Sequence, residues 1–238
     1  MKFRIFALIT AGAFLVALGG TPATAAGKAP SGAARVTRPA ALPKAPGVLL
    51  YDQTDDPNGV AITSQDFEGS FDAYDNQLGD DFVVPTGHKW IIKSIVAPGV
   101  DKIAGDLTTL VNVYIYKNSG SLPGGLKYQS NSLPATDDGL GNLTINAIPK
   151  LGNVSGKAAL KAGHYWISVQ ARLDYDGNGD QWYWSTRNTQ SNTASVWQNP
   201  GGGFGLGCTS WTTTTTCIPA GEGPDQLFSL SGKDKIVP

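Results

Sequence analysis

The sequence predicts an all-β domain, a two-sheet antiparallel β-sandwich of the jelly-roll kind with one disulfide that closes a short loop. Three observations predict it. Apolar and polar side chains alternate along several segments, Gly and Pro dipeptides interrupt the chain at short intervals, and no capped amphipathic helix longer than about ten residues is evident. Because each half-buried sheet must cover its apolar face, two sheets packed against each other are the economical arrangement.

Three segments carry the alternation. Residues 165–172 place Tyr, Ile, Val and Ala on one face and Trp, Ser, Gln and Arg on the other. Residues 110–117 place Val, Val and Ile opposite Asn, Tyr and Tyr, and residues 90–96 form a third run rich in β-formers. We therefore expect strands with one buried and one polar face.

Residues 1–25 have the layout of a secretory signal peptide. Lys2 and Arg4 precede an apolar run of about 14 residues, shorter than the roughly 20 that span a bilayer, and small residues follow at a cleavage site. We expect a secreted product, extracellular or associated with the cell surface, that keeps no transmembrane segment once the signal is removed. An uncleaved membrane anchor is the alternative.

Residues 26–47 are rich in Pro, Ala and Gly, contain four bases and no acid, and predict a flexible basic tether. The sandwich is expected over residues 48–232, followed by a C-terminal tail at 233–238. Of the 18 bases, two lie in the signal and four in the tether, which leaves twelve bases against 19 acids, a net charge of −7. An acidic domain without a basic stripe argues against nucleic acid as a partner.

The two cysteines, Cys208 and Cys217, lie close together in the sequence C-T-S-W-T-T-T-T-T-C. In an exported protein such a pair is expected to form a disulfide. Two cysteines and two histidines also fall short of a zinc cluster.

Five stretches of the sequence form a recognisable set. They are Tyr51-Asp52-Gln53, Asp80–Pro85, Gly163–Gln170, the Asn199–Gly205 loop that leads to Cys208, and Gly223-Pro224-Asp225. Together they resemble a β-sandwich module that recurs in bacterial secreted and cell-surface proteins. The resemblance covers nearly all of residues 48–232, and it implies an exported sandwich. It supplies no catalytic residues, because such modules have no settled biochemical activity.

Two acidic groups suggest calcium as a cofactor. The first lies in residues 52–81, which hold nine acids and no base, so that a bound Ca²⁺ would relieve their repulsion. The alternative is a solvated acidic edge that prevents pairing with other chains. The candidate ligands of this group are Asp72, Asp75, Asp80 and Asp81.

The second group follows the opening of an EF-hand calcium loop, D-x-D-x-N-G-D, over residues 174–180. Ser185 stands where the bidentate Glu of such a loop is required, and Asn-Gly is also an ordinary hairpin turn. A plain hairpin tip is therefore the alternative. The candidate ligands are Asp174, Asp176, Asn178 and Asp180.

Aromatic residues give the other functional signal. Rings on a solvated sheet face or a loop rim stack on sugar rings, and Asn, Gln and Asp bind the hydroxyls. Trp166 shares the predicted polar face of its strand with Gln170 and Arg172, whereas in Trp182-Tyr183-Trp184 one face must be core. The candidate ligand-binding residues are Trp166, Gln170, Arg172, Trp182, Trp184 and Trp211.

No catalytic set emerges. The chain has no G-x-S-x-G motif, and no spacing selects two of its 19 acids as a glycosidase pair. We expect a secreted non-catalytic binding module whose partner is an extracellular glycan or another cell-surface polymer. A structural or adhesive extracellular protein, and a secreted hydrolase acting on glycans or peptides, are the alternatives.

Overall fold

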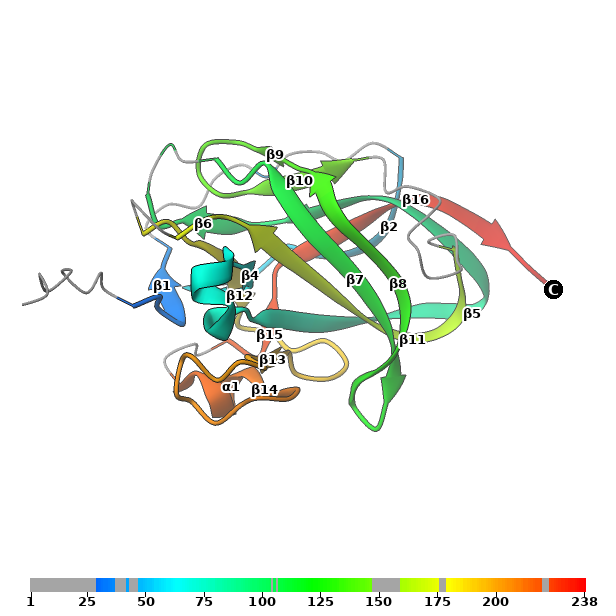
Figure 1. Ribbon diagram of the computed structural model, residues 1–238. Coiled ribbons are helices and arrows are strands. Elements are labelled where there is room, and N and C mark those ends of the chain that lie inside the picture. Colours follow the sequence, from blue (N-terminus) through cyan, green and yellow to red (C-terminus); the bar gives the residue numbers. More distant parts are fainter. Residues whose placement is uncertain are drawn as a thin grey trace, which may run out of the picture.

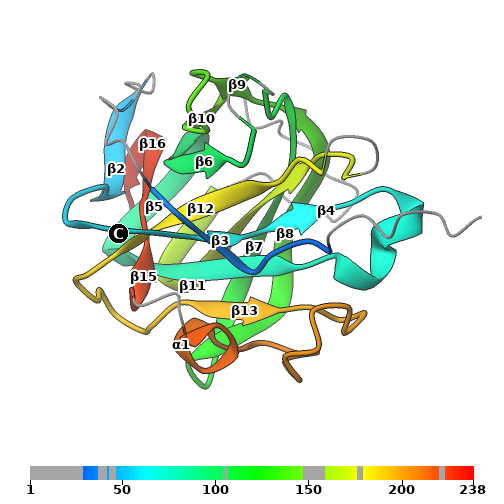
Figure 2. The same ribbon diagram turned by 90° about the vertical axis from the view of Figure 1, so that its left-hand side faces the viewer.

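The computed structural model describes residues 29–36, 42, 47–103, 105, 107–146, 159–175, 179–219 and 223–238. The predicted signal peptide and most of the predicted tether lie outside these residues. Within them, two antiparallel sheets face each other, and Figure 2 looks onto the smaller sheet with the larger one behind it. The predicted two-sheet sandwich is therefore confirmed.

The smaller sheet runs in the order β1-β3-β12-β15, and β6 also pairs with β12. Its central strand β12 contains Trp182 and Trp184, whose side chains point toward the other sheet. The strands are β1 (Ala33–Arg35), β3 (Pro57–Thr63), β6 (Gly99–Asp101), β12 (Trp182–Arg187) and β15 (Asp225–Gln226).

The larger sheet runs in the order β14-β13-β5-β11-β7-β8. Its longest strand, β5, pairs with β11, β13, β10 and β16 along its length, and Figure 1 shows it curving around one end of the sandwich. The strands are β2 (Val48–Gln53), β4 (Gln65–Asp66), β5 (Gln77–Ala97), β7 (Leu110–Ser119), β8 (Leu122–Pro134), β9 (Thr136–Asp137), β10 (Leu143–Asn146), β11 (Ala159–Arg172), β13 (Val196–Gln198), β14 (Thr212–Thr213) and β16 (Phe228–Ile236).

Helical structure in the described residues is short. A 3₁₀ helix, η1 (Gly69–Tyr74), precedes β5, and one α-helical turn, α1 (Thr214–Cys217), follows β14. Both are shorter than about ten residues, the upper limit that the sequence predicted for any helix.

Aromatic side chains join the two sheets in the core. Trp184 of β12 meets Phe228 of β16 at 6.2 Å between ring centroids, and Phe228 in turn contacts Phe82 of β5. All three are fully buried. Because such rings each remove a large apolar area from water, they stabilise the contact between the layers.

The alternation in residues 165–172 predicts the strand correctly but not its burial. Both faces of β11 are buried from Tyr165 to Ala171, including Trp166, Ser168 and Gln170 on the face predicted to be solvated. β11 is a central strand, flanked by β5 and β7, and its outer face is covered. On that face Gln170 hydrogen-bonds with Tyr114 and with the Asn76 carbonyl, whereas Ser168 Oγ is buried without a hydrogen-bond partner.

Strands extend beyond both ends of the expected domain, residues 48–232. Residues 33–35, within the predicted tether, form β1 and pair with β3, and the Ser31 backbone N–H donates to Gln181 Oε1 at 2.9 Å. At the other end β16 runs to Ile236 and pairs with β5, so it enters the predicted tail.

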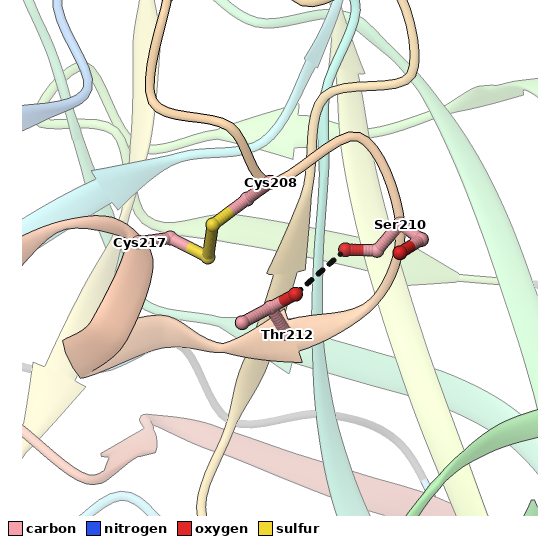
Figure 3. The surroundings of a disulfide bond; sticks show 4 residues. All are labelled: Cys208, Ser210, Thr212 and Cys217. Atoms are coloured by element: carbon pink, nitrogen blue, oxygen red, sulfur yellow. Dashed lines mark hydrogen bonds between the residues drawn. A yellow bond between two sulfur atoms is a disulfide. The ribbon is translucent and has the colours of Figure 1, made fainter.

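The predicted disulfide is present between Cys208 and Cys217, at a sequence separation of 9 (Figure 3). Within the loop that it closes, the Thr212 hydroxyl donates to the Ser210 carbonyl at 3.0 Å. Both cysteines are buried, so the bond also attaches this loop to the core.

Replacing both Cys208 and Cys217 by alanine should lower the free energy of unfolding by about 2 to 3 kcal/mol, because the loop closure then no longer restricts the unfolded chain. Urea denaturation followed by tryptophan fluorescence measures the change. Reductant should destabilise the wild-type protein by a similar amount and leave the double variant unaffected. A loss below about 0.5 kcal/mol would contradict this role of the disulfide.

Candidate functional site

Three half-buried aromatic residues lie together on the outer face of the larger sheet. Tyr114 and Tyr116 alternate along β7, and their rings are nearly parallel, with centroids 6.1 Å apart and planes 14° apart. Trp211 meets Tyr116 edge to face at 5.8 Å. We call this the aromatic strip and include in it the three glutamines that contact or border these rings, so that its members are Tyr114, Tyr116, Trp211, Gln77, Gln170 and Gln198.

Strand register explains why these residues share a face. Tyr116 is paired with Trp166 and Tyr114 with Ser168, and paired residues of antiparallel strands point to the same side. Gln170 lies two residues beyond Ser168 on the same strand, so it faces the same side. The polar face that the sequence predicted for β11 is thus the floor of the strip.

The disulfide loop supplies Trp211. A β-carbon at Gly79 of β5 would lie 3.5 Å from the Trp211 ring, an ordinary van der Waals distance, so the indole lies directly over this part of β5. Because Trp211 lies between Cys208 and Cys217, the disulfide restricts the loop that carries it. The cross-link therefore serves the strip as well as the fold.

Side-chain amides hold the two phenols in place. Tyr116 donates to Gln77 Oε1 at 3.3 Å, and the same oxygen accepts from Gln198 Nε2 at 2.9 Å. Tyr114 donates to Gln170 Oε1 at 3.3 Å, while Gln170 Nε2 donates to the Asn76 carbonyl. Rings that are already fixed lose little conformational freedom when a ligand binds.

The strip is uncharged at physiological pH. Burial raises the pKa of Tyr114 and of Tyr116 above the usual value, and the Asp66 charge raises that of Tyr114 further. At one end of the strip Arg172 pairs with Asp66, with Nε and Oδ2 3.0 Å apart. The local charges are therefore paired, and an uncharged ligand suits this surface better than an ionic one.

The predicted ligand-binding residues separate into two groups. Gln170 and Trp211 belong to the strip, and the exposed Arg172 lies at its end. Trp182 and Trp184 are fully buried in the core, with their Nε1 atoms donating to backbone carbonyls, so neither offers a ring face to a ligand. Trp166 is also fully buried and donates to Asn118 Oδ1 at 2.9 Å, although it lies on the outer face.

The sequence analysis did not select Tyr114 and Tyr116 as ligand-binding residues. The signal that could have found them is the alternation in β7, which places both on the polar side of the strand. Their glutamine partners are distant in the sequence, so that only the strand pairing shows how the rings are held.

The first acidic group is dispersed. Asp72 is exposed on η1, and Asp75 Oδ1 accepts from the Phe67 backbone N–H at 2.8 Å. Asp80 and Asp81 are buried and, as neighbours on β5, point to opposite faces of the sheet. Among the described residues no group of three or more His, Cys, Asp or Glu is arranged to hold a metal ion.

The second acidic group is described only in part, because Asp176 and Asn178 lie outside the described residues. Asp174 is exposed, whereas Asp180 is buried and accepts from the Gln181 backbone N–H at 2.8 Å. The Lys102 ammonium donates to the Gly179 carbonyl and lies 4.7 Å from the centre of the Tyr175 ring. A protein cation thus already contacts this loop.

Asp80, Asp81 and Asp225 are three buried carboxyl side chains whose charges influence one another, although Asp81 lies on the opposite face of β5 from Asp80. Asp80 Oδ2 accepts from Gln53 Nε2 and from the Gln226 backbone N–H, at 2.7 and 2.6 Å. Burial, followed by the nearby Asp225 charge, raises the pKa of Asp80. Burial and the Asp81 charge raise the pKa of Asp225 to about 7, so this group takes up protons when the chain folds.

His164, which is partly exposed, contacts the Asp81 carboxyl group. Its Nε2 lies 2.6 Å from Asp81 Oδ2, and its ring stacks on Trp166 at 6.2 Å between centroids. The histidine side chain is 26% exposed while that of Asp81 is fully buried. A buried carboxylate that orients a partly exposed imidazole is an arrangement suited to general acid–base chemistry.

A comparison of the chain with protein families found no match, and a comparison with curated proteins found none either. In the part of the chain that the structure describes, no helix has the length and apolar character needed to cross a membrane.

Proposed function

We propose that this protein is an exported, non-catalytic binding module that takes an uncharged polysaccharide on the aromatic strip. The observation that carries the proposal is the pair of parallel, half-exposed Tyr114 and Tyr116 rings, fixed by glutamine amides beside Trp211. Export and a β-sandwich module of the bacterial secreted kind are parts of the same proposal. They rest on the signal layout and on the sequence stretches that resemble such modules.

Carbohydrate fits the strip for two reasons. Aromatic faces pack against the C–H faces of sugar rings, and amide groups both donate to and accept from hydroxyls. Gln77 and Gln198, which are half-buried, combine both capacities at positions next to the rings, whereas the buried Gln170 holds Tyr114 in place. Because the phenols and the indole are held before binding, little of the contact energy is lost in ordering them.

Co-sedimentation with insoluble cellulose, chitin and xylan tests the proposal. Wild-type protein should bind at least one of them saturably, and Tyr116→Ala or Trp211→Ala should weaken that binding roughly tenfold, which corresponds to about 1.4 kcal/mol. Tyr116→Phe keeps the ring and should retain most of the affinity. Leu49→Ala, an exposed side chain of β2, serves as the control and should bind as wild type does.

Each binding measurement is made in millimolar Ca²⁺ and again in chelator, which tests the predicted calcium cofactor separately. A calcium-stabilised module should show a higher melting temperature with Ca²⁺. Absence of binding to all three polymers, with an intact fold, would refute the polysaccharide proposal and favour the structural or adhesive alternative.

A secreted hydrolase is the second candidate, and the His164–Asp81 pair is the observation that favours it. The same incubations are assayed for released reducing ends. Turnover that His164→Ala abolishes, while Tyr116→Phe retains it, would make the protein an enzyme. Saturable binding without turnover supports the binding module.

A further inference from the structure

Lysine side chains from three strands lie together on the larger sheet. Lys89 of β5 is paired with Lys161 of β11 on one side and with Lys235 of β16 on the other. Because paired residues of antiparallel strands point to the same side of a sheet, these three lysines form a row across the strands. Lys233, two residues before Lys235 on β16, faces the same way. We call these four residues the lysine row.

The lysine row points away from the core. Trp90 and Leu160, the neighbours of Lys89 and Lys161 in the chain, are paired with each other and belong to the core. Successive side chains of a strand alternate, so the lysines lie on the outer face of the sheet, the face that carries the aromatic strip. Lys89 is half-buried and the other three lysines are exposed. Figure 1 shows this part of the sheet, where β5 curves beside the end of β16.

The positive charges of the row are not neutralised within the described residues. The segments that carry the row, residues 85–94, 159–165 and 228–238, contain a single acid, Asp234. Asp234 alternates to the other side of β16, and its Oδ2 lies 2.8 Å from His88 Nδ1. No salt bridge in the described part of the chain involves a lysine of the row. Because like charges directly opposite each other on neighbouring strands repel, the row destabilises the free protein.

Protection of a sheet edge explains only part of the row. Lysines on an edge strand prevent pairing with other chains. β16 pairs with β2 only as far as Gly232, so Lys233 and Lys235 lie at such an edge. Lys89, however, is flanked by β11 and β16. Edge protection therefore does not account for the central member of the row.

We propose that the lysine row binds an acidic polysaccharide, a linear chain that carries carboxylates at regular intervals. Neighbouring strands lie about 4.8 Å apart, so the three paired lysines can follow an extended chain over about 10 Å. Lysine provides a point charge on a flexible stem, which suits repeated charges better than the rigid fork of arginine. The choice of a polysaccharide among linear polyanions rests on the proposed function, because the aromatic strip occupies the same face of the sheet.

Calorimetric titration of the full chain with polygalacturonate, which has a carboxylate on each sugar, tests the site. Fully methyl-esterified polygalacturonate is the matched ligand, because it keeps the sugars and loses the charges. We expect saturable binding of polygalacturonate and at least tenfold weaker binding of the ester. The affinity for polygalacturonate should fall as NaCl is raised from about 50 to about 300 mM, since salt screens exposed charges.

The double variant Lys89→Gln/Lys235→Gln should bind polygalacturonate roughly tenfold more weakly than wild type, because two exposed ion pairs are lost. Lys117→Gln/Lys127→Gln removes the same charge from β7 and β8, and it should bind within about twofold of wild type. Both variants keep the basic N-terminal segment, so a contribution from that segment is equal in the two. Circular dichroism and the melting temperature establish that each variant is folded. If the first variant does not fold, Lys233→Gln/Lys235→Gln takes its place.

The proposal is overturned if polygalacturonate does not bind saturably, if the ester binds equally well, or if the two double variants lose the same affinity. Binding of phosphatidylglycerol vesicles or duplex DNA, without binding of polygalacturonate, would overturn the choice of partner. The Lys89→Gln/Lys235→Gln variant should bind cellulose, chitin or xylan as wild type does, and Trp211→Ala should keep its affinity for polygalacturonate. Failure of the aromatic strip is therefore distinguishable from failure of the lysine row.

Discussion

Replacing Trp184 by alanine should lower the free energy of unfolding by about 3 to 5 kcal/mol, the range for the loss of a large aromatic side chain from a core. Trp184 is fully buried between the sheets and contacts Trp182 and Phe228. Its Nε1 also donates to the Leu227 carbonyl at 2.6 Å, and the substitution leaves that acceptor without its partner. Urea denaturation followed by circular dichroism measures the loss.

Trp211→Ala is the matched comparison, because the same side chain is removed from a half-buried loop position. We expect it to cost much less stability and to weaken polysaccharide binding instead. The opposite pattern, a folded Trp184→Ala variant that loses under about 1 kcal/mol and no longer binds polysaccharide, would restore Trp184 as a ligand-binding residue.

Stability should fall as the pH rises from about 4 to about 8. The pKa of Asp225 is raised to about 7 by burial and the Asp81 charge, and that of Asp101 to about 8 by burial and the neighbouring Asp137. The folded state therefore holds protons that the unfolded chain releases near pH 4, so their stabilising contribution is complete below pH 4 and lost as the pH approaches the folded values. Each such proton gives a slope of roughly 1.4 kcal/mol per pH unit.

Asp225→Asn tests the part of this dependence that comes from Asp225. The amide cannot ionise, its oxygen can still accept from the Ser191 backbone N–H, and the repulsion from Asp81 and Asp80 is removed. Urea denaturation at intervals between pH 4 and pH 8 should show a flatter profile by about one proton. Asp174→Asn, at an exposed carboxylate, should leave the profile unchanged. Wild-type stability that rises with pH over this range would contradict the explanation.

The fold class could be predicted because it depends on local patterns. Alternation identifies β11 and β7 directly, and the two cysteines that lie close in the sequence form the predicted disulfide. Burial of a strand's second face depends on what lies next to it, and the sequence does not show that β11 is central. For this reason Trp166 looked solvated although it is buried.

The site was harder to predict for the same reason. Trp182 and Trp184 form a dense aromatic run, yet strand β12 turns both into the core. Tyr114 and Tyr116 have no other aromatic residue beside them in the sequence. Their rings are held by hydrogen bonds to Gln170 and Gln77, which belong to strands distant in the chain. Asp225 influences the pKa of Asp80 because the fold brings their charges near each other, and the spacing of the two residues in the sequence does not indicate this.

We expect the aromatic strip to contact polysaccharide. Amide hydrogen exchange of the full chain, with and without saturating cellohexaose, xylohexaose or chitohexaose, tests it most directly. One of these oligosaccharides should slow exchange in residues 112–118 of β7 and 208–213 of the disulfide loop, and leave exchange in β1 and the start of β3 unchanged. Protection confined to other parts of the chain, or none with any of the three, would contradict it.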